Sequence, residues 1–220
     1  MAQGLGLEQV RFDTEDGVSL EAEIRHPDGA AKGSAVICHA HPRHGGSKDH
    51  PVLWSLRIEL ARRGFVVVSF NFRGVMGSGG SFGGGEAEVL DVRAAVGRIR
   101  QDALGPTVVT GWSFGAHVAL REALDDGRVA ALALLGLPLG GVGPALPPLP
   151  PPERLRLFDR PVLLLAGAAD EYCPGPELEA LGQELPNAEV RILLDADHYF
   201  RRREREAAAI VGTFAAALVR

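Results

Sequence analysis

Short apolar runs alternate with longer amphipathic segments along most of the chain. Near the start, residues 10–12 and 18–24 alternate polar and apolar side chains on either side of Glu15-Asp16-Gly17, a pattern typical of an antiparallel hairpin. Later runs of consecutive apolar residues have the length of strands and indicate strands covered on both faces. These predicted buried strands span residues 35–38, 65–70, 107–110, 129–135, 161–165 and 190–194.

Segments with helical periodicity separate the predicted strands. Such helices are predicted at 53–61, 86–99, 117–120, 176–185 and 204–218. Regular alternation of strands and helices is typical of an α/β fold, with a mostly parallel sheet and helices on both faces. We expect residues 1–220 to form one domain.

One segment interrupts this alternation. Residues 140–152 contain six prolines, which exclude a helix interior or a central strand. We predict that residues 141–160 form a short, extended surface excursion in place of a lid. A proline-rich ligand for a partner domain is the alternative interpretation.

Composition narrows the class of protein. The chain has 220 residues, of which 46% are hydrophobic, enough for one sizeable core, and a net charge of -5 argues against a nucleic-acid partner. The first residues lack the pattern of a signal peptide, and no apolar run is long enough to cross a membrane. Two cysteines make no disulfide framework, so we expect reduced thiols and a cytoplasmic location. The sequence leaves a homodimer open.

The strongest chemical signal lies in the middle of the chain. The strand predicted at 107–110 leads into Gly111-Trp112-Ser113-Phe114-Gly115, and a helical run follows at 117–120. A tight turn between strand and helix exposes a serine for nucleophilic attack, and the flanking glycines relieve the crowding of such a turn. This context predicts Ser113 as a nucleophile.

A hydrolytic serine needs a base and an orienting carboxylate, and functional groups in parallel sheets collect beyond the carboxyl ends of strands. The strand predicted at 161–165 leads to Asp170, and the strand predicted at 190–194 leads to His198. The order Ser113, Asp170, His198 is the chain order of a serine triad on this topology. Glu171 and Asp197 are the alternative carboxylates.

Backbone donors for a developing oxyanion are expected at two places. Phe114 follows the nucleophile, and the loop at 39–46 follows an earlier strand. Because Pro42 has no N–H, we assign the second donor to the backbone of Arg43. Candidates for lining the substrate site are His41, Gly45 and Trp112.

Five motifs can now be considered together: His41-Pro42 with Gly45-Gly46, Asn71-Phe72-Arg73-Gly74, the serine pentapeptide at 111–115, Asp170, and Ala196-Asp197-His198. Together they resemble the α/β-hydrolase superfamily, in particular small lidless bacterial serine esterase-like proteins related to prolyl-oligopeptidase catalytic domains and dienelactone hydrolases. The resemblance implies an α/β-hydrolase fold with an eight-stranded sheet whose second strand runs antiparallel. It also implies the triad above and no metal or cofactor. From the serine turn and the triad we expect hydrolysis of small or exposed carboxylic esters (EC 3.1 class), with thioesters and amides as alternatives.

Two departures from this branch stand out. Ala40 occupies a position that is often proline, and Met76 one that is often glycine, which bears on the shape of the loop at 77–85. Dienelactone hydrolases use a cysteine nucleophile where this chain has Ser113, so that specific activity is not implied.

Two rival functions remain open in the sequence. His39, His41 and His44 resemble the zinc-binding motif of metallo-β-lactamase-type hydrolases, but Arg43 stands where that motif has an aspartate and would repel a metal. The other rival is an inactive hydrolase fold that serves as a binding protein, since fold does not fix function.

Overall fold

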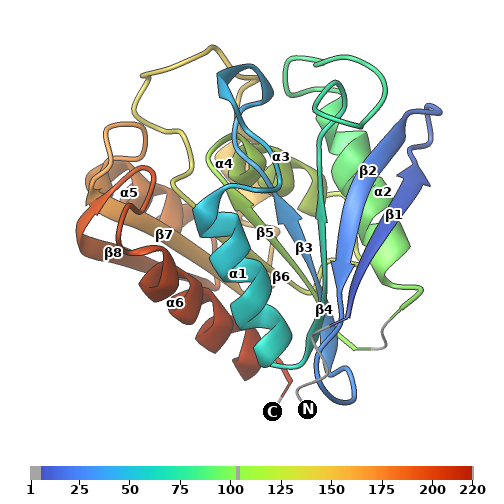
Figure 1. The fold of residues 1–220 in the computed structure, drawn as a ribbon. Coiled ribbons are helices and arrows are strands. Elements are labelled where there is room, and N and C mark those ends of the chain that lie inside the picture. Colours follow the sequence, from blue (N-terminus) through green and yellow to red (C-terminus); the bar gives the residue numbers. More distant parts are fainter. Residues whose placement is uncertain (1–5, 103–104, 220) are drawn as a thin grey trace.

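A twisted eight-stranded sheet forms the centre of the molecule (Figure 1). The structure is a computed structural model, and it describes residues 6–102 and 105–219. The strand order is β1-β2-β4-β3-β5-β6-β7-β8. In chain order the strands are β1 (Leu7–Asp13), β2 (Ser19–Arg25), β3 (Gly33–Cys38), β4 (Phe65–Phe70), β5 (Thr107–Trp112), β6 (Ala131–Leu135), β7 (Val162–Ala169) and β8 (Ala188–Asp197).

The strand pairing confirms the mostly parallel sheet. β2 runs antiparallel to both β1 and β4, and every other neighbouring pair is parallel. The predicted hairpin and the antiparallel second strand are therefore both present. All carboxyl ends of β3 to β8 point to one edge of the sheet.

Helices cover both faces of the sheet, as predicted (Figure 1). Side chains of successive residues in a strand point to opposite faces, so Ala35 and Ile37 pack with one group of helices while Val36 and Cys38 pack with the other. Helices α1 (Pro51–Arg62) and α6 (Glu204–Ala217) lie on the first face. The second face carries α2 (Glu88–Ile99), α3 (Phe114–Ala123), α4 (Pro152–Leu155) and α5 (Gly175–Glu184).

The last strand differs from its predicted limits of 190–194. β8 extends over Ala188–Asp197 and pairs only with β7, with an irregularity opposite Gly167 to Ala169. An edge strand exposes one side to solvent, so its ends contain exposed polar residues such as Glu189 and Asp195, which do not form an apolar pattern. The strand therefore includes residues 195–197 and ends directly before His198.

The proline-rich segment has no regular secondary structure over residues 140–151, as expected. Pro152, which was expected to stay outside any helix, begins the short helix α4, because proline fits the first helical position. Leu146 and Leu149 pack against the core, so the segment lies on the body of the protein instead of projecting from it.

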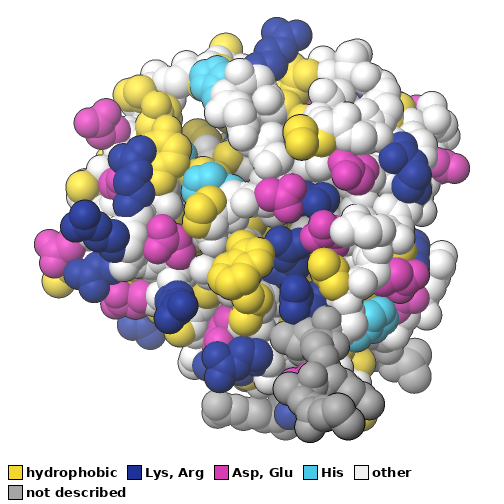
Figure 2. All heavy atoms as spheres, viewed as in Figure 1, with side chains coloured by type: hydrophobic (Ala, Val, Ile, Leu, Met, Phe, Trp, Pro, Cys, Tyr) yellow, Lys and Arg dark blue, Asp and Glu magenta, His cyan; other side chains and the backbone are white. Residues whose placement is uncertain are grey.

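The outer surface shows no single dominant charge on the face viewed in Figure 2, where acidic and basic side chains of the described residues are interspersed. Trp54 of α1 is 50% exposed on the protein surface and lines a shallow groove with Ile58 and Ala208. Among the described residues, no helix has both the length and the apolar character needed to cross a bilayer.

Candidate active site

Ser113 lies in the sharp turn between β5 and α3. Its backbone has φ 57° and ψ -120°, a strained conformation for a residue with a side chain. A Cβ on Gly111 would come 2.3 Å from the carbonyl oxygen of Gly115, and a Cβ on Gly115 would come 2.3 Å from that of Cys38. The turn therefore requires glycine at both positions, for the steric reason on which its prediction rested.

The structure brings the three predicted triad residues together. His198 Nε2 lies 3.0 Å from Ser113 Oγ, and His198 Nδ1 lies 2.9 Å from each carboxylate oxygen of Asp170. All three side chains are buried. Because a carboxylate only accepts, Nδ1 carries the proton toward Asp170, and Nε2 is left to accept the hydroxyl proton of Ser113.

Backbone donors hold the carboxylate of Asp170 in place. Asp170 Oδ1 accepts the N–H groups of Tyr172 at 2.9 Å and Cys173 at 3.0 Å. The alternative carboxylates are directed elsewhere: Glu171 is exposed, and Asp197 accepts from the backbone of Tyr199 and pairs with the side chain of Arg201. Asp170 is therefore the carboxylate that contacts His198.

Trp112 fixes the other side of the histidine. The sequence predicted Trp112 as a pocket-lining residue, and the structure places it there, almost fully buried. Its indole Nε1 also donates a hydrogen bond of 2.9 Å to the backbone oxygen of His198. The end of β5 is thus tied directly to the turn that follows β8, an interaction without any sequence signal.

Gly136 is a site residue that the sequence analysis missed. It follows β6 with φ 54°, and a Cβ there would lie 3.1 Å from both Asp170 Oδ2 and His198 Nδ1. A side chain at this position would crowd the hydrogen bond between those two residues. Its only sequence signal is a glycine at the carboxyl end of a strand.

Two residues beside Ser113 have backbone N–H groups that are free to donate. Neither Phe114 N–H, at the start of α3, nor His41 N–H has an acceptor among residues 6–102 and 105–219. Both residues line the pocket. They are placed to donate to an oxygen that develops negative charge at the serine.

The assignment of Arg43 as the second donor needs correction. Pro42 begins a short 3-10 turn (η1, Pro42–His44), which directs the N–H of Arg43 back to His41 Nδ1 at 3.2 Å. The guanidinium of Arg43 lies over the ring of Phe82, 5.0 Å from its centroid. The N–H of His41, two residues earlier, has no acceptor in the described part of the chain, so His41 replaces Arg43 as the candidate donor.

The histidine motif does not form a metal-ligand set. His39 is fully buried and uses both ring nitrogens: Nδ1 donates to Ala40 O at 2.6 Å and Nε2 accepts from Phe72 N–H at 3.0 Å. Burial lowers its pKa to about 4, in keeping with a neutral ring. Within the described ranges, no cluster of three or more His, Cys, Asp or Glu residues could hold a metal ion. His39 instead fixes the start of the loop at 39–50.

The glycine-rich loop at 77–85 packs against the lining of the pocket. The buried carboxylate of Glu88 accepts the N–H groups of Gly83 and Gly85, each at 2.7 Å. The loop places the ring of Phe82 against His41, with centroids 4.9 Å apart. Met76, which departs from the usual glycine, adopts the left-handed conformation with φ 49°.

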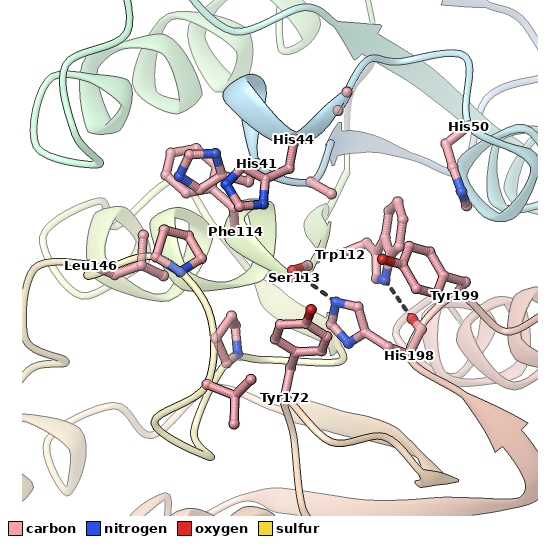
Figure 3. Close-up of a pocket in the computed structure, with 16 residues that line it drawn as sticks. His41, His44, His50, Trp112, Ser113, Phe114, Leu146, Tyr172, His198 and Tyr199 are labelled. Atoms are coloured by element: carbon pink, nitrogen blue, oxygen red, sulfur yellow. Dashed lines mark hydrogen bonds between the residues drawn. The ribbon is translucent and has the colours of Figure 1, made fainter.

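Around Ser113 the surface is hollowed into a pocket of about 680 Å³, including the part open to solvent (Figure 3). Its lining contains the predicted residues His41, Gly45 and Trp112. Half of the sixteen lining residues have ring side chains of the aromatic or imidazole type, and none is Asp, Glu, Lys or Arg. Several other lining residues were not predicted, because they come from distant segments: His50, Val142, Pro144, Leu146, Tyr172 and Tyr199.

Burial favours the uncharged form of two imidazoles in the pocket lining, His41 and His50. The pKa of His41 is lowered to about 4, first by burial and then by the nearby His44 and Arg43. Burial is also the main reason why the pKa of His50 is lowered. The lining around Ser113 and His198 therefore combines aromatic and apolar side chains with imidazoles, and contains no Asp, Glu, Lys or Arg.

Comparison with known proteins agrees with this geometry. The family model described as "Alpha/beta hydrolase domain" matches residues 33–218. An alpha-beta serine hydrolase homologue from Coxiella burnetii is 28% identical, with a TM-score of 0.81 over 94% of this chain and 96% of that one. An a/b serine hydrolase without lid from Xanthomonas campestris is 25% identical, with a TM-score of 0.79 over 95% and 94%. An uncharacterised protein of Rickettsia prowazekii is 27% identical over 78% of this chain and 74% of its own length.

Proposed function

The chain belongs to the alpha/beta hydrolase domain family, and on that premise we propose that it is a serine hydrolase which cleaves carboxylic esters through an acyl-enzyme on Ser113. One observation carries the proposal: an unbroken chain of hydrogen bonds from Ser113 Oγ through His198 to Asp170. This arrangement allows a neutral imidazole to remove the hydroxyl proton while the carboxylate stabilises the resulting charge.

The proposed reaction uses only groups of the chain, the ester and water. His198 Nε2 takes the proton of Ser113 as Oγ bonds to the ester carbonyl carbon, and the carbonyl oxygen becomes an oxyanion that accepts from the N–H groups of Phe114 and His41. When the carbon–oxygen bond to the alcohol breaks, the imidazolium returns the proton to the leaving oxygen. A water molecule then attacks the acyl carbon while His198 takes its proton. When the bond from that carbon to Oγ breaks, His198 returns the proton to Oγ, and the acid and Ser113 are released.

Labelling with a fluorophosphonate, followed by intact-mass measurement and peptide mapping, tests the nucleophile. We expect one adduct, located on Ser113. The exposed Ser81 offers a matched control: Ser81→Ala should still be labelled, whereas Ser113→Ala should lose both the adduct and esterase activity, the latter by about 10³-fold or more. Full activity of Ser113→Ala would exclude the mechanism.

The base is tested by His198→Ala. We expect activity to fall by a similar factor with little change in thermal stability, since His198 lies in a turn at the sheet edge outside the two apolar cores. Loss of the fold together with activity would indicate a structural role. A folded wild-type protein that takes no label would favour the inactive binding protein.

A further inference from the structure

Ser113 divides the pocket into two unlike sides. In Figure 3, Trp112, Tyr199 and His50 lie on one side of the serine, the side of His198, while Phe114, Leu146, His41 and His44 lie on the other. An ester has two arms that meet at the carbonyl carbon. The reaction geometry decides which arm occupies which side.

The side of His198 is built from stacked rings. The rings of Tyr172, Tyr199 and Trp112 lie 4.5, 5.5 and 5.8 Å from the His198 ring, centroid to centroid. The ring of His50 stacks on Trp112 at 4.1 Å with an interplanar angle of 30°. These rings offer flat faces and edges suited to another aromatic ring.

Proton transfer places the alcohol arm of the ester on this side. The leaving oxygen must come within hydrogen-bond reach of His198 Nε2 to receive its proton, while the oxyanion points to the N–H groups of Phe114 and His41. The rest of the alcohol, which is attached to the leaving oxygen, therefore extends beyond the imidazole of His198. It meets the rings of Trp112, Tyr172 and Tyr199.

The acyl arm is left with a compartment closed by the proline-rich segment. Leu146 lies on the side of Phe114 (Figure 3) and packs against the core, and Val142 and Pro144 of the same segment also line the pocket. Because residues 140–151 lie on the body of the protein, this wall limits the length of the acyl group.

The charge of the pocket lining restricts the class of substrate further. None of the sixteen lining residues is acidic, and none is lysine or arginine. Two cations lie near the pocket: Arg201 lies over the ring of Tyr199 and pairs with Asp197 at 3.1 Å, and Arg43 lies over the ring of Phe82, which is not part of the lining. A charged group on the alcohol arm would therefore lose hydration without gaining an oppositely charged partner.

We propose that the substrate is an uncharged ester that joins a compact acyl group to an alcohol bearing a flat aromatic ring, with the ring held by Trp112, Tyr172 and Tyr199. This inference rests on the proposed serine hydrolase function. It adds the chemical class of each arm of the ester.

The main test compares benzyl acetate with cyclohexylmethyl acetate, two esters of primary alcohols of similar size that differ in the flatness of one ring. We expect kcat/KM to be about tenfold higher for the benzyl ester, as an additional aromatic contact would produce. Tyr199→Leu should reduce this preference to about threefold or less, while Tyr199→Phe should keep it, because the ring is retained. Trp54→Leu removes an exposed aromatic residue outside the pocket and should leave the preference unchanged.

Two further substrates test the acyl arm and the charge. Benzyl octanoate and the anionic 4-carboxybenzyl acetate should each be cleaved about tenfold less efficiently than benzyl acetate. Equal kcat/KM for the benzyl and cyclohexylmethyl esters, or a preference that Tyr199→Leu leaves intact, would overturn the aromatic assignment. A preference for the octanoate would overturn the compact acyl arm, and efficient cleavage of the carboxylate ester would overturn neutrality.

Failure of the proposed substrate class can be distinguished from failure of the proposed serine hydrolase function. If Ser113 is labelled by fluorophosphonate and the simple acetates are cleaved, but without the expected preferences, only the substrate class is wrong. If Ser113 takes no label and no ester is cleaved, the proposed function itself fails.

Discussion

The backbone of Ser113 combines φ 57° with ψ -120°, a conformation that costs about 1–3 kcal/mol in an ordinary residue. Its N–H donates to Leu135 O at 2.8 Å, and its carbonyl accepts from Ala116 and His117 at the start of α3. These bonds join the strained residue to β6 through its N–H and to α3 through its carbonyl oxygen. At the scale of single residues, the position of the nucleophile is therefore set before any substrate arrives.

Gly136 gives a residue-scale prediction. Gly136→Ala would place a methyl group 3.1 Å from Asp170 Oδ2 and His198 Nδ1, so the hydrogen bond between them must shift. We expect kcat for ester hydrolysis to fall by about 10–100-fold, the effect of displacing a catalytic group slightly.

Gly141→Ala is a matched control for this change. Gly141 also has positive φ, but a Cβ there meets nothing within 4 Å. Both variants should lose a similar, small amount of stability in urea unfolding, about 1 kcal/mol from the backbone alone. Equal losses of kcat in the two variants would mean that crowding at Asp170 and His198 is unimportant.

His117 gives a second residue-scale prediction, about stability. It is 2% exposed, and neither ring nitrogen has a hydrogen-bond partner in the described part of the chain. Burial, with a smaller effect from Arg121, lowers its pKa from 6.5 to about 4. Between these values the unfolded chain binds a proton that the folded protein refuses, so the free energy of unfolding falls as the pH falls.

His117→Leu removes this penalty. We expect the variant to be at least as stable as wild type at pH 7.5, and its advantage to grow by about 2 kcal/mol by pH 5, since each pKa unit corresponds to about 1.4 kcal/mol. Urea unfolding of both proteins at pH 7.5, 6 and 5 measures the difference. An advantage independent of pH would show that His117 is not held neutral.

Residue by residue, the site could be predicted only where the signal is local. Ser113 lies in a pentapeptide whose glycines have a steric cause, and Asp170 and His198 follow strands that end at the same edge of the sheet. Arg43 was assigned wrongly because a 3-10 turn redirects its N–H, and proline at the start of that turn does not reveal the direction. Gly136 could not be found because its importance depends on two side chains that approach from other strands.

At the scale of elements, the bond from Trp112 to the backbone of His198 joins β5 to the turn between β8 and α6. Trp112→Phe keeps a ring in the pocket but leaves the carbonyl of His198 without this donor. We expect kcat to fall by about tenfold, because the turn that carries the base is less firmly positioned, with a smaller change in KM.

Trp54→Phe is the matched control, since Trp54 lies on the surface of α1, outside the pocket. It should leave kcat and KM as in wild type. A Trp112→Phe protein with unchanged kcat, or with a reduced melting temperature as its only defect, would assign the bond a structural role alone.

Most strands and helices were predictable, because buried parallel strands consist of uninterrupted runs of apolar residues. β8 was underestimated for the opposite reason: as an edge strand it includes exposed polar residues. The segment at 140–151 was predicted correctly as irregular. Its role as a pocket wall was not predictable, because proline content excludes structures without saying against what the chain packs.

At the scale of the whole molecule, the parallel sheet gathers the site. The triad residues follow β5, β7 and β8, and the loop with His41 follows β3, so all four segments meet at the carboxyl edge (Figure 1). Alternation of strands and helices was enough to predict this meeting place. The pocket lining could not be predicted, since it combines residues as distant as His50, Leu146 and Tyr199.

The placement of the two tryptophans has an optical consequence. One lies on the outer surface and the other stacks beside the candidate catalytic histidine, so a variant with Trp54 replaced by phenylalanine would emit indole fluorescence only from the reaction centre. Occupancy of the pocket could then be followed in real time by the intensity and colour of that single emitter. Trp112 would thus be an intrinsic fluorescent probe of the pocket once Trp54 is replaced.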